Sequence, residues 1–223
     1  MIPSISVHNR STLVTDAEVA VVVDAVNIQA KRDFAPFWGF VPRFKFKGKS
    51  PWTLIVVDNQ VDPGALGEHM GSSKFGYPLG IVSVRPDLEA GDPWSSTFSH
   101  ESLEMALNPF VGCLVRKDDK LYALEDCDAV EDNQFAYPIK VGRKNVIVSD
   151  FVTPAWFGLT NGTQYDFTGH VKQPFQILPG GYAPVESATT GKRSIVLHSG
   201  KSMHGSKIPA GSRKQRWLAG RAA

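Results

Sequence analysis

The N-terminal part of the chain carries a hydrophobic pattern that predicts an amphipathic helix. Valine and alanine recur at helical spacing from Val19 to Ala30, so they fall on one face of a helix. Thr15 and Glu18 have the spacing of a capping box, in which each side chain bonds to the other residue's backbone. We therefore predict a helix from about Asp16 to Lys31, with its apolar face in the core.

Short β-branched and aromatic runs predict strands in other parts of the chain. The runs in its first half are Arg43–Phe46, Trp52–Val57 and Tyr77–Arg85. Two later runs, Tyr137–Val141 and Asn145–Ser149, are joined by residues 142–144, which begin with glycine and indicate a β-hairpin. Beyond Gly180, the segment Ser194–His198 has the pattern of a strand. Helices and strands in this order predict an α+β fold.

A second helix of about four turns is predicted between two prolines. Asp92 followed by Pro93 is typical of a helix start, because aspartate caps the first turn and proline suits the first helical position. Asn108 followed by Pro109 indicates the end, because the residue before proline avoids the helical region.

Three residues of this helix, His100, Glu101 and Glu104, suggest a metal site. Positions i and i+4 lie one above the other on a helix, so His100 and Glu104 can hold one metal ion. Glu101 can then act as general base, as in the HExxH zinc hydrolases, whose second histidine is replaced here by Glu104. His100 and Glu101 also border the apolar stripe of the helix, where unpaired charge is costly and a metal would compensate it.

The densest acidic cluster of the chain, Leu124–Asp132, supplies candidates for a third ligand. Glu125 follows Glu104 by 21 residues, close to the interval at which glutamate-type zincins take their third ligand from a second helix. Three more acidic residues of the cluster compete for this role: Asp126, Asp128 and Glu131. The alternative interpretation is a solvated acidic turn without metal.

Other histidines and the cysteines are weaker candidates. His69 stands in the glycine-rich segment Gly64–Gly71, which predicts a loop, and it could contact the substrate or a metal ligand, as could Glu131. The remaining histidines have no partner at ligand spacing and are predicted to be incidental: His8, His170, His198 and His204. Cys113 and Cys127 form no CxxC unit, and for Cys127 burial is expected rather than ligation.

The donor set bears on the choice of cation. One imidazole with two carboxylates makes a more electron-rich site than sets with two or three histidines. Zinc is the first expectation, but a carboxylate-rich site discriminates less well, so manganese, iron and calcium are credible.

Composition and charge divide the chain into two parts. A length of 223 residues and 42% hydrophobic content suit one domain, which we predict over residues 1–185. After Glu186 the chain has no acidic residue, while eight basic residues follow it: Lys192, Arg193, Lys201, Lys207, Arg213, Lys214, Arg216 and Arg221. Residues 186–223 are therefore predicted to form an extended basic tail, ordered by neighbouring protein subunits with Trp217 as anchor, or, less strongly, by nucleic acid.

The sequence predicts no contact with membranes. No apolar stretch approaches the roughly 20 residues that span a bilayer. The segment Met1–Ser4 also lacks the charged and apolar regions of a signal peptide, so we expect synthesis and folding in the cytoplasm.

Three segments carry a resemblance to known proteins: Ser99–Met105 (SHESLEM), Glu125–Asp132 (EDCDAVED) and Val148–Phe157 (VSDFVTPAWF). In these, the chain resembles uncharacterised phage-borne and bacterial proteins regarded as metallopeptidase-like, and the resemblance covers about residues 15–184. Through His100 and Glu101 it resembles the zincins more distantly. The resemblance implies a zincin-like α+β domain with a mixed sheet and a metal-binding helix.

Two functions from different classes follow from this resemblance. The first is a metallopeptidase that cleaves peptide bonds with Glu101 as base. The second is a virion structural or assembly protein, implied by the phage association, in which the fold is non-catalytic and the basic tail links subunits. In that case the metal would join the helix to the acidic cluster.

Overall fold

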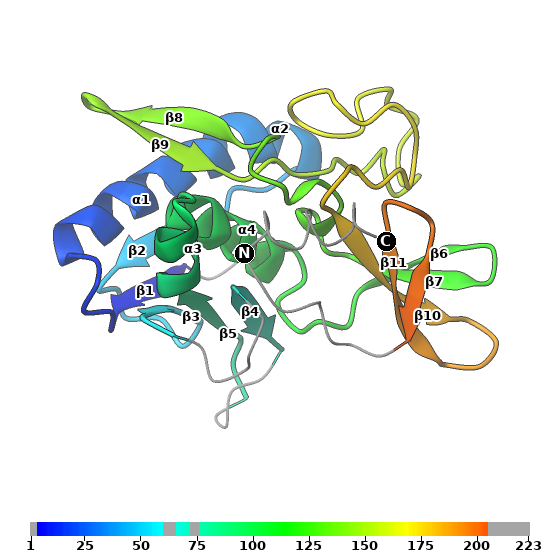
Figure 1. Cartoon of the computed structure of the whole chain (residues 1–223), viewed down its shortest axis with the longest axis horizontal. Helices are drawn as coiled ribbons and strands as arrows, with labels where there is room; N and C mark the ends of the chain where they lie inside the picture. Colours follow the sequence, from blue (N-terminus) through cyan, green and yellow to red (C-terminus); the bar gives the residue numbers. More distant parts are fainter. Residues whose placement is uncertain (1–3, 60–65, 72–75, 205–223) are drawn as a thin grey trace.

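The computed structural model describes residues 4–59, 66–71 and 76–204 and has an α+β fold, which confirms the predicted class (Figure 1). Its helices are α1 (Asp16–Gln29), η1 (Ala30–Phe34), α2 (Ala35–Trp38), α3 (Arg85–Ala90), α4 (Trp94–Leu107) and η2 (Asp128–Val130). Its strands are β1 (Ile5–Asn9), β2 (Phe44–Phe46), β3 (Thr53–Val57), β4 (Gly67–Met70), β5 (Leu79–Ser83), β6 (Leu114–Lys117), β7 (Lys120–Ala123), β8 (Tyr137–Val141), β9 (Lys144–Val148), β10 (Tyr182–Ser187), β11 (Arg193–Leu197) and β12 (Ser202–His204).

The first sheet is mixed, with strand order β2-β1-β3-β5-β4. Strands β1, β2, β3 and β5 pair in parallel, and β4 pairs antiparallel to β5. Within the described residues β4 is therefore an edge strand. The strands predicted at 43–46, 52–57 and 77–85 are confirmed here within two residues at each end.

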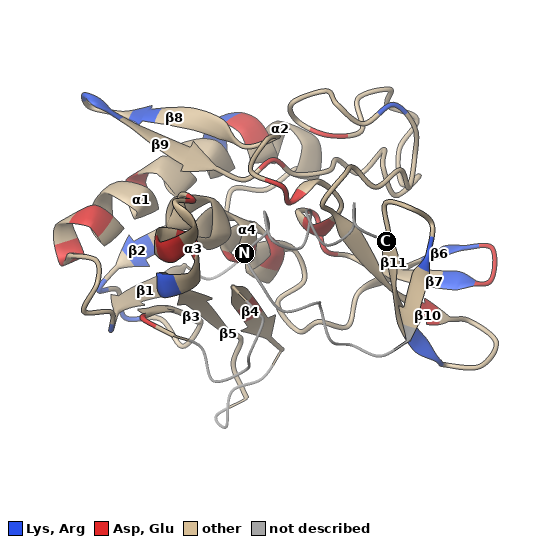
Figure 2. Ribbon diagram, in the orientation of Figure 1, with Lys and Arg blue, Asp and Glu red and all other residues tan. Residues whose placement is uncertain are grey.

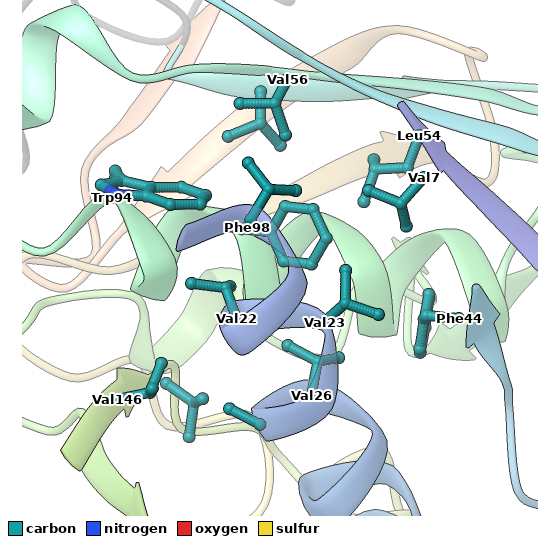
Figure 3. Packing of buried hydrophobic residues seen from close by; sticks show 14 of the residues in the cluster. Val7, Val22, Val23, Val26, Phe44, Leu54, Val56, Trp94, Phe98 and Val146 are labelled. Atoms are coloured by element: carbon teal, nitrogen blue, oxygen red, sulfur yellow. The ribbon is translucent and has the colours of Figure 1, made fainter. Parts of the chain in front are cut away.

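The main core lies between this sheet and the helices α1 and α4. Figure 3 shows Phe98 of α4 between sheet residues such as Leu54 and Val56 on one side and Val22 and Val26 of α1 on the other, all in one core cluster. The capping box predicted at Thr15 is present, and α1 begins at Asp16 as expected. This packing holds α4 rigidly, because its residues from Trp94 to Ala106 are all buried.

The start of α4 differs in detail from the prediction. Its N-cap is Pro93, which has extended backbone angles and makes no side-chain capping bond, so Asp92 does not cap this helix. The reason is that α3 ends just before, at a left-handed Gly91, and the backbone N–H of Asp92 donates to the carbonyl of Asp87. The segment that leads from β5 into α4 is therefore a tight turn that contains a short helix.

The second sheet is antiparallel, with strand order β12-β11-β10-β7-β6, and it lies on the other side of α4 from α1 (Figure 1). The prediction of an extended tail from residue 186 is wrong for residues 186–204. The predicted division between domain and tail, at residues 185 and 186, falls inside β10. This strand pairs with β7 and β11, and β11 pairs with β12. Val185 and Val196 are buried beside Trp156, and this burial offsets the cost of ordering the segment. Residues 205–223, including Trp217, lie outside the described residues.

A β-hairpin of β8 and β9 is present as predicted and covers α1 and α4 (Figure 1). No helix in the described part of the chain is both long enough and apolar enough to cross a membrane.

Backbone contacts hold the acidic cluster against the rest of the fold. The carbonyl of Asp126 accepts a bond from the N–H of Val152 at 2.6 Å, and that of Ala129 accepts one from Leu178 at 2.9 Å. Gly181 also packs so closely that a Cβ there would lie 2.5 Å from the carbonyl oxygen of Ala129. The cluster is therefore positioned by residues 26 to 52 positions later in the chain.

Candidate metal centre

Helix α4 brings the three predicted residues into a buried site. His100, Glu101 and Glu104 are each at most 5% exposed. The Nε2 atom of His100 lies 3.1 Å from Oε2 of Glu104, as expected for positions one helical turn apart. The local sequence thus places an imidazole and two carboxyl groups where water has little access.

The acidic cluster lies against this helix and is not solvated. Glu125, Asp126, Asp128 and Glu131 are all buried, which excludes the alternative of a solvated turn. Asp128 is at the start of η2, and its Oδ1 lies 3.3 Å from Nε2 of His100. In Figure 2 the acidic positions of α4 and of the neighbouring segment lie in the interior, whereas basic positions lie at outer strand ends.

His69 also reaches the site, although the sequence predicted a loop. It lies in β4, which contacts α4, because β4 pairs with β5 along the edge of the first sheet. Its side chain is only 6% exposed. Its Nδ1 lies 3.7 Å from Oε2 of Glu101 and 3.9 Å from Oε2 of Glu104, and its Nε2 lies 3.5 Å from Oε2 of Glu125.

Neighbouring residues orient the carboxyl groups. The amide of Asn108 donates to Oε1 of Glu125 at 3.1 Å, and the backbone N–H of Cys127 donates to Oε1 of Glu104 at 3.2 Å. Each of these glutamates therefore has one oxygen bound by protein and the other turned toward histidine. The thiol of Cys127 is also close, because its Sγ and donor atoms of His100 and Glu104 all lie within 4.8 Å of one another.

The electrostatics of the site favour either protonated carboxyl groups or a bound cation. Five carboxyl groups, those of Glu101, Glu104, Glu125, Asp126 and Asp128, lie near two histidines. Burial, reinforced by the neighbouring carboxylates, raises the pKa of Glu104 to about 7 and the pKa of Glu125 and Asp126 well above its usual range. Neither carboxyl oxygen of Asp126 finds a hydrogen-bond partner within the described part of the chain. Buried negative charge of this kind is stable only when it is paired.

The spacing of the donor atoms fits a bound ion. Two donors on one tetrahedral ion, at metal–ligand distances of about 2.0–2.2 Å, are separated by about 3.3–3.6 Å. The distances from His100 Nε2 to Glu104 and Asp128, 3.1 and 3.3 Å, are close to this range. Imidazole and carboxylate together suit zinc, manganese or iron.

If a cation occupies this site, its binding should depend on pH through Glu104. Because burial raises the pKa of this carboxyl from 4.5 to about 7, the metal-free protein keeps it protonated below pH 7. The cation needs the ionised form, so affinity should fall by about tenfold per pH unit below 7. In the unfolded chain the carboxyl group of Glu104 ionises near pH 4.5. The metal-free folded protein therefore loses stability as the pH rises from 4.5 to 7.

The difference in melting temperature between metal-loaded and metal-free protein should therefore widen from pH 5 to pH 8. Scanning calorimetry on both forms measures it. A difference that narrows over this range would contradict the assignment of Glu104 as a ligand.

Asp150, Asp166 and His170 form a separate group that no pattern in the sequence indicated, and their donor atoms lie within 4.8 Å of one another. Here the carboxylates are already satisfied. Asp166 accepts bonds from the N–H groups of His170 and Val171, and Asp150 accepts bonds from the N–H and hydroxyl of Thr168. The carboxylates of this group therefore have hydrogen-bond donors, whereas both carboxyl oxygens of Asp126 in the first site lack one among the described residues.

No family model, curated protein or solved structure matches this chain.

Proposed function

We propose that this chain is a zincin-like metal-binding domain that hydrolyses peptide bonds. His100, Glu104 and Asp128 hold a divalent cation, and Glu101 is the general base. The observation that carries the proposal is the position of His100 Nε2, 3.1 Å from Glu104 and 3.3 Å from Asp128 inside a buried cluster with excess negative charge. Of the four candidates for the third ligand that the sequence left open, Asp128 is the one whose carboxylate lies 3.3 Å from Nε2 of His100.

The order of elements supports a zincin-like domain. A strand of the mixed sheet, β5, leads by a short connection into the helix that carries His100 and Glu101. This is the order in zincin folds that the sequence resemblance implies. The third ligand comes from a later segment, although it belongs to a short 3₁₀ turn and not to a long second helix.

The protein's own residues supply proton transfer and positioning. When bound, the cation would polarise the peptide carbonyl and activate water as a nucleophile. Glu101 would accept the proton of the attacking water and pass it to the leaving amine. His69 lies 3.7 Å from Glu101 and helps to hold its carboxylate in place. Strand β4 is next to these residues, and as an edge strand it can bind an extended peptide through its backbone.

The Glu101→Gln variant tests this function. The wild-type protein, purified without chelator, should contain divalent metal by elemental analysis and cleave members of an unbiased peptide library, detected by mass spectrometry. The variant should keep the metal, because glutamine matches the shape of glutamate. Its cleavage rate should fall by roughly 10²–10⁴-fold, the usual contribution of a general base.

The matched control is Glu89→Gln, because Glu89 is an exposed glutamate on α3. This variant should cleave peptides like the wild type. Full activity in Glu101→Gln would remove Glu101 from the mechanism, and a wild-type protein without metal would overturn the proposal as a whole.

A second candidate function, a virion structural protein with a non-catalytic metal site, is favoured by Cys127. Its thiol lies close enough to His100 and Glu104 to complete a closed shell of protein ligands, which is typical of structural sites. Burial raises the pKa of this thiol well above its usual range, and nearby carboxylates raise it further. The thiol would therefore ionise only on binding a metal.

Cobalt substitution distinguishes the two functions. A thiolate-to-cobalt charge-transfer band that disappears in Cys127→Ser would support the closed structural site. Its absence would support the open site of a hydrolase. Contacts of residues 205–223 with other subunits, or with nucleic acid, belong to this second function and remain predictions from charge alone.

A further inference from the structure

A second set of donor atoms lies next to the proposed cation site. Among the described residues, two groups have the spacing of metal ligands and share Glu104. One contains His100 and Cys127, and the other contains His69 and Glu125. Asp128, which the proposed first site includes, lies 3.3 Å from His100 but belongs to neither group. Each group thus has its own imidazole, and the shared carboxylate stands between them.

The second group holds buried atoms that lack partners. The Nε2 atom of His69 and the Oε2 atom of Glu125 make no hydrogen bond to any described residue. Both side chains are more than nine-tenths buried, at 6% and 7% exposure, and the two atoms face each other at 3.5 Å. Leaving two such groups unsatisfied is costly, and a cation between them would satisfy both.

The position of Glu104 suits a bridging ligand. Its Oε2 lies 3.1 Å from Nε2 of His100, and one donor atom of its carboxylate lies within 4.8 Å of donor atoms of both His69 and Glu125. In two-metal sites, ions about 3.5–4 Å apart share ligands of this kind. A carboxylate that belongs to both groups of donor atoms can bind one ion with each imidazole.

The other nitrogen of His69 fits the same interpretation. A histidine that binds metal through one ring nitrogen usually directs the other toward a carboxylate, which sets its tautomer and orientation. With Nε2 facing Glu125, Nδ1 faces Glu101 at 3.7 Å. His69 therefore has the surroundings of a ligand on both sides of its ring.

The net charge of the cluster also favours a second cation. If all five carboxyl groups named above were ionised and both histidines neutral, one divalent ion would leave a net charge of −3, and a second ion would reduce it to −1. A buried site with a charge near neutrality is much less costly than one with three uncompensated charges.

We propose that His69, Glu125 and Glu104 form a second divalent-cation site, so that the centre is binuclear with Glu104 as the bridge. The inference rests on the proposed function for its first ion. The ligand class is a divalent cation that accepts nitrogen and oxygen donors, such as Mn²⁺, Fe²⁺ or Zn²⁺.

The test uses Mn²⁺ as the probe. The full chain is stripped of metal, reconstituted with Mn²⁺ alone, and examined by elemental analysis and electron paramagnetic resonance. The wild type should hold two ions per chain, with the spectrum of an exchange-coupled pair. Glu125→Gln should hold one ion with an uncoupled spectrum. This substitution retains the oxygen that accepts from Asn108, so the fold should be unaffected.

His69→Ala should reproduce the Glu125→Gln result. His170→Ala is the matched control, because it removes the histidine of the separate Asp150–Asp166 group, and it should keep two coupled ions. Loss of one ion in His170→Ala would assign the second ion to that other group and overturn the inference.

The two proposals fail in different ways. A wild type with one ion that is lost in His100→Ala but kept in Glu125→Gln would overturn the second site and leave the first intact. His69 would then be a protonated counter-charge to the carboxylates. A wild type without bound Mn²⁺ or any other divalent ion would overturn both.

Discussion

Substitution of His100 by alanine should abolish binding at the first cation site and lower the melting temperature by about 8–16 °C. A cation present at about 1,000 times its Kd stabilises the folded state by about 4 kcal/mol. For a chain of 223 residues, each kcal/mol corresponds to about 2–4 °C. His100 is the residue that contacts both Glu104 and Asp128, so no single other imidazole can replace it at this site.

Calorimetry and elemental analysis measure this effect together. His8→Ala is the control, because His8 is a partly buried histidine in β1 that belongs to none of the donor groups. The ion content of this variant should be unchanged. Chelator should lower the melting temperature of the wild type much more than that of His100→Ala. Equal responses to chelator would show that His100 does not bind the cation.

Substitution of Gly67 by alanine should reduce peptide hydrolysis by at least about 10²-fold, the contribution of a general base, while the first cation stays bound. Gly67 begins β4 and packs directly on Glu101. A Cβ at this position would lie 2.5 Å from Cγ of Glu101 and 2.6 Å from its Oε1. Since β4 is held by its pairing with β5, the buried carboxylate must move.

Gly112→Ala controls for the general effect of replacing glycine. The nearest atom to a Cβ there is 3.7 Å away, so the substitution should change neither activity nor metal content. The rate of peptide hydrolysis by the Gly67→Ala variant is compared with the rate for the Glu101→Gln variant under the same conditions. A Gly67→Ala protein with wild-type activity is incompatible with a base held in the position of Glu101.

The sequence predicted the elements whose causes are local. The capping box at Thr15 needs only residues three positions apart, and it starts α1 where expected. The spacing of His100 and Glu104 is likewise a property of one helix, so their contact followed from the pattern alone. The β8–β9 hairpin also depends on a short turn between adjacent strands.

Predictions failed where distant segments decide the outcome. Glycines around His69 indicate a loop, but pairing with β5 makes that segment a strand. The basic composition after Glu186 indicates a tail, but strands β7, β10 and β11 pair and bury Val185 and Val196. In both cases the free energy of tertiary packing exceeds the local preference of the residues.

By itself, the sequence determined that one helix carries an imidazole and two carboxyl groups on neighbouring positions, because helical geometry repeats every turn. Which acidic residue contacts His100 was decided only by the tertiary structure. Asp128 does so because Val152, Leu178 and Gly181 anchor the acidic cluster. The approach of His69 to Glu125 was decided in the same way, since it requires β4 to lie beside α4. Such contacts depend on long-range packing, which short sequence patterns do not encode.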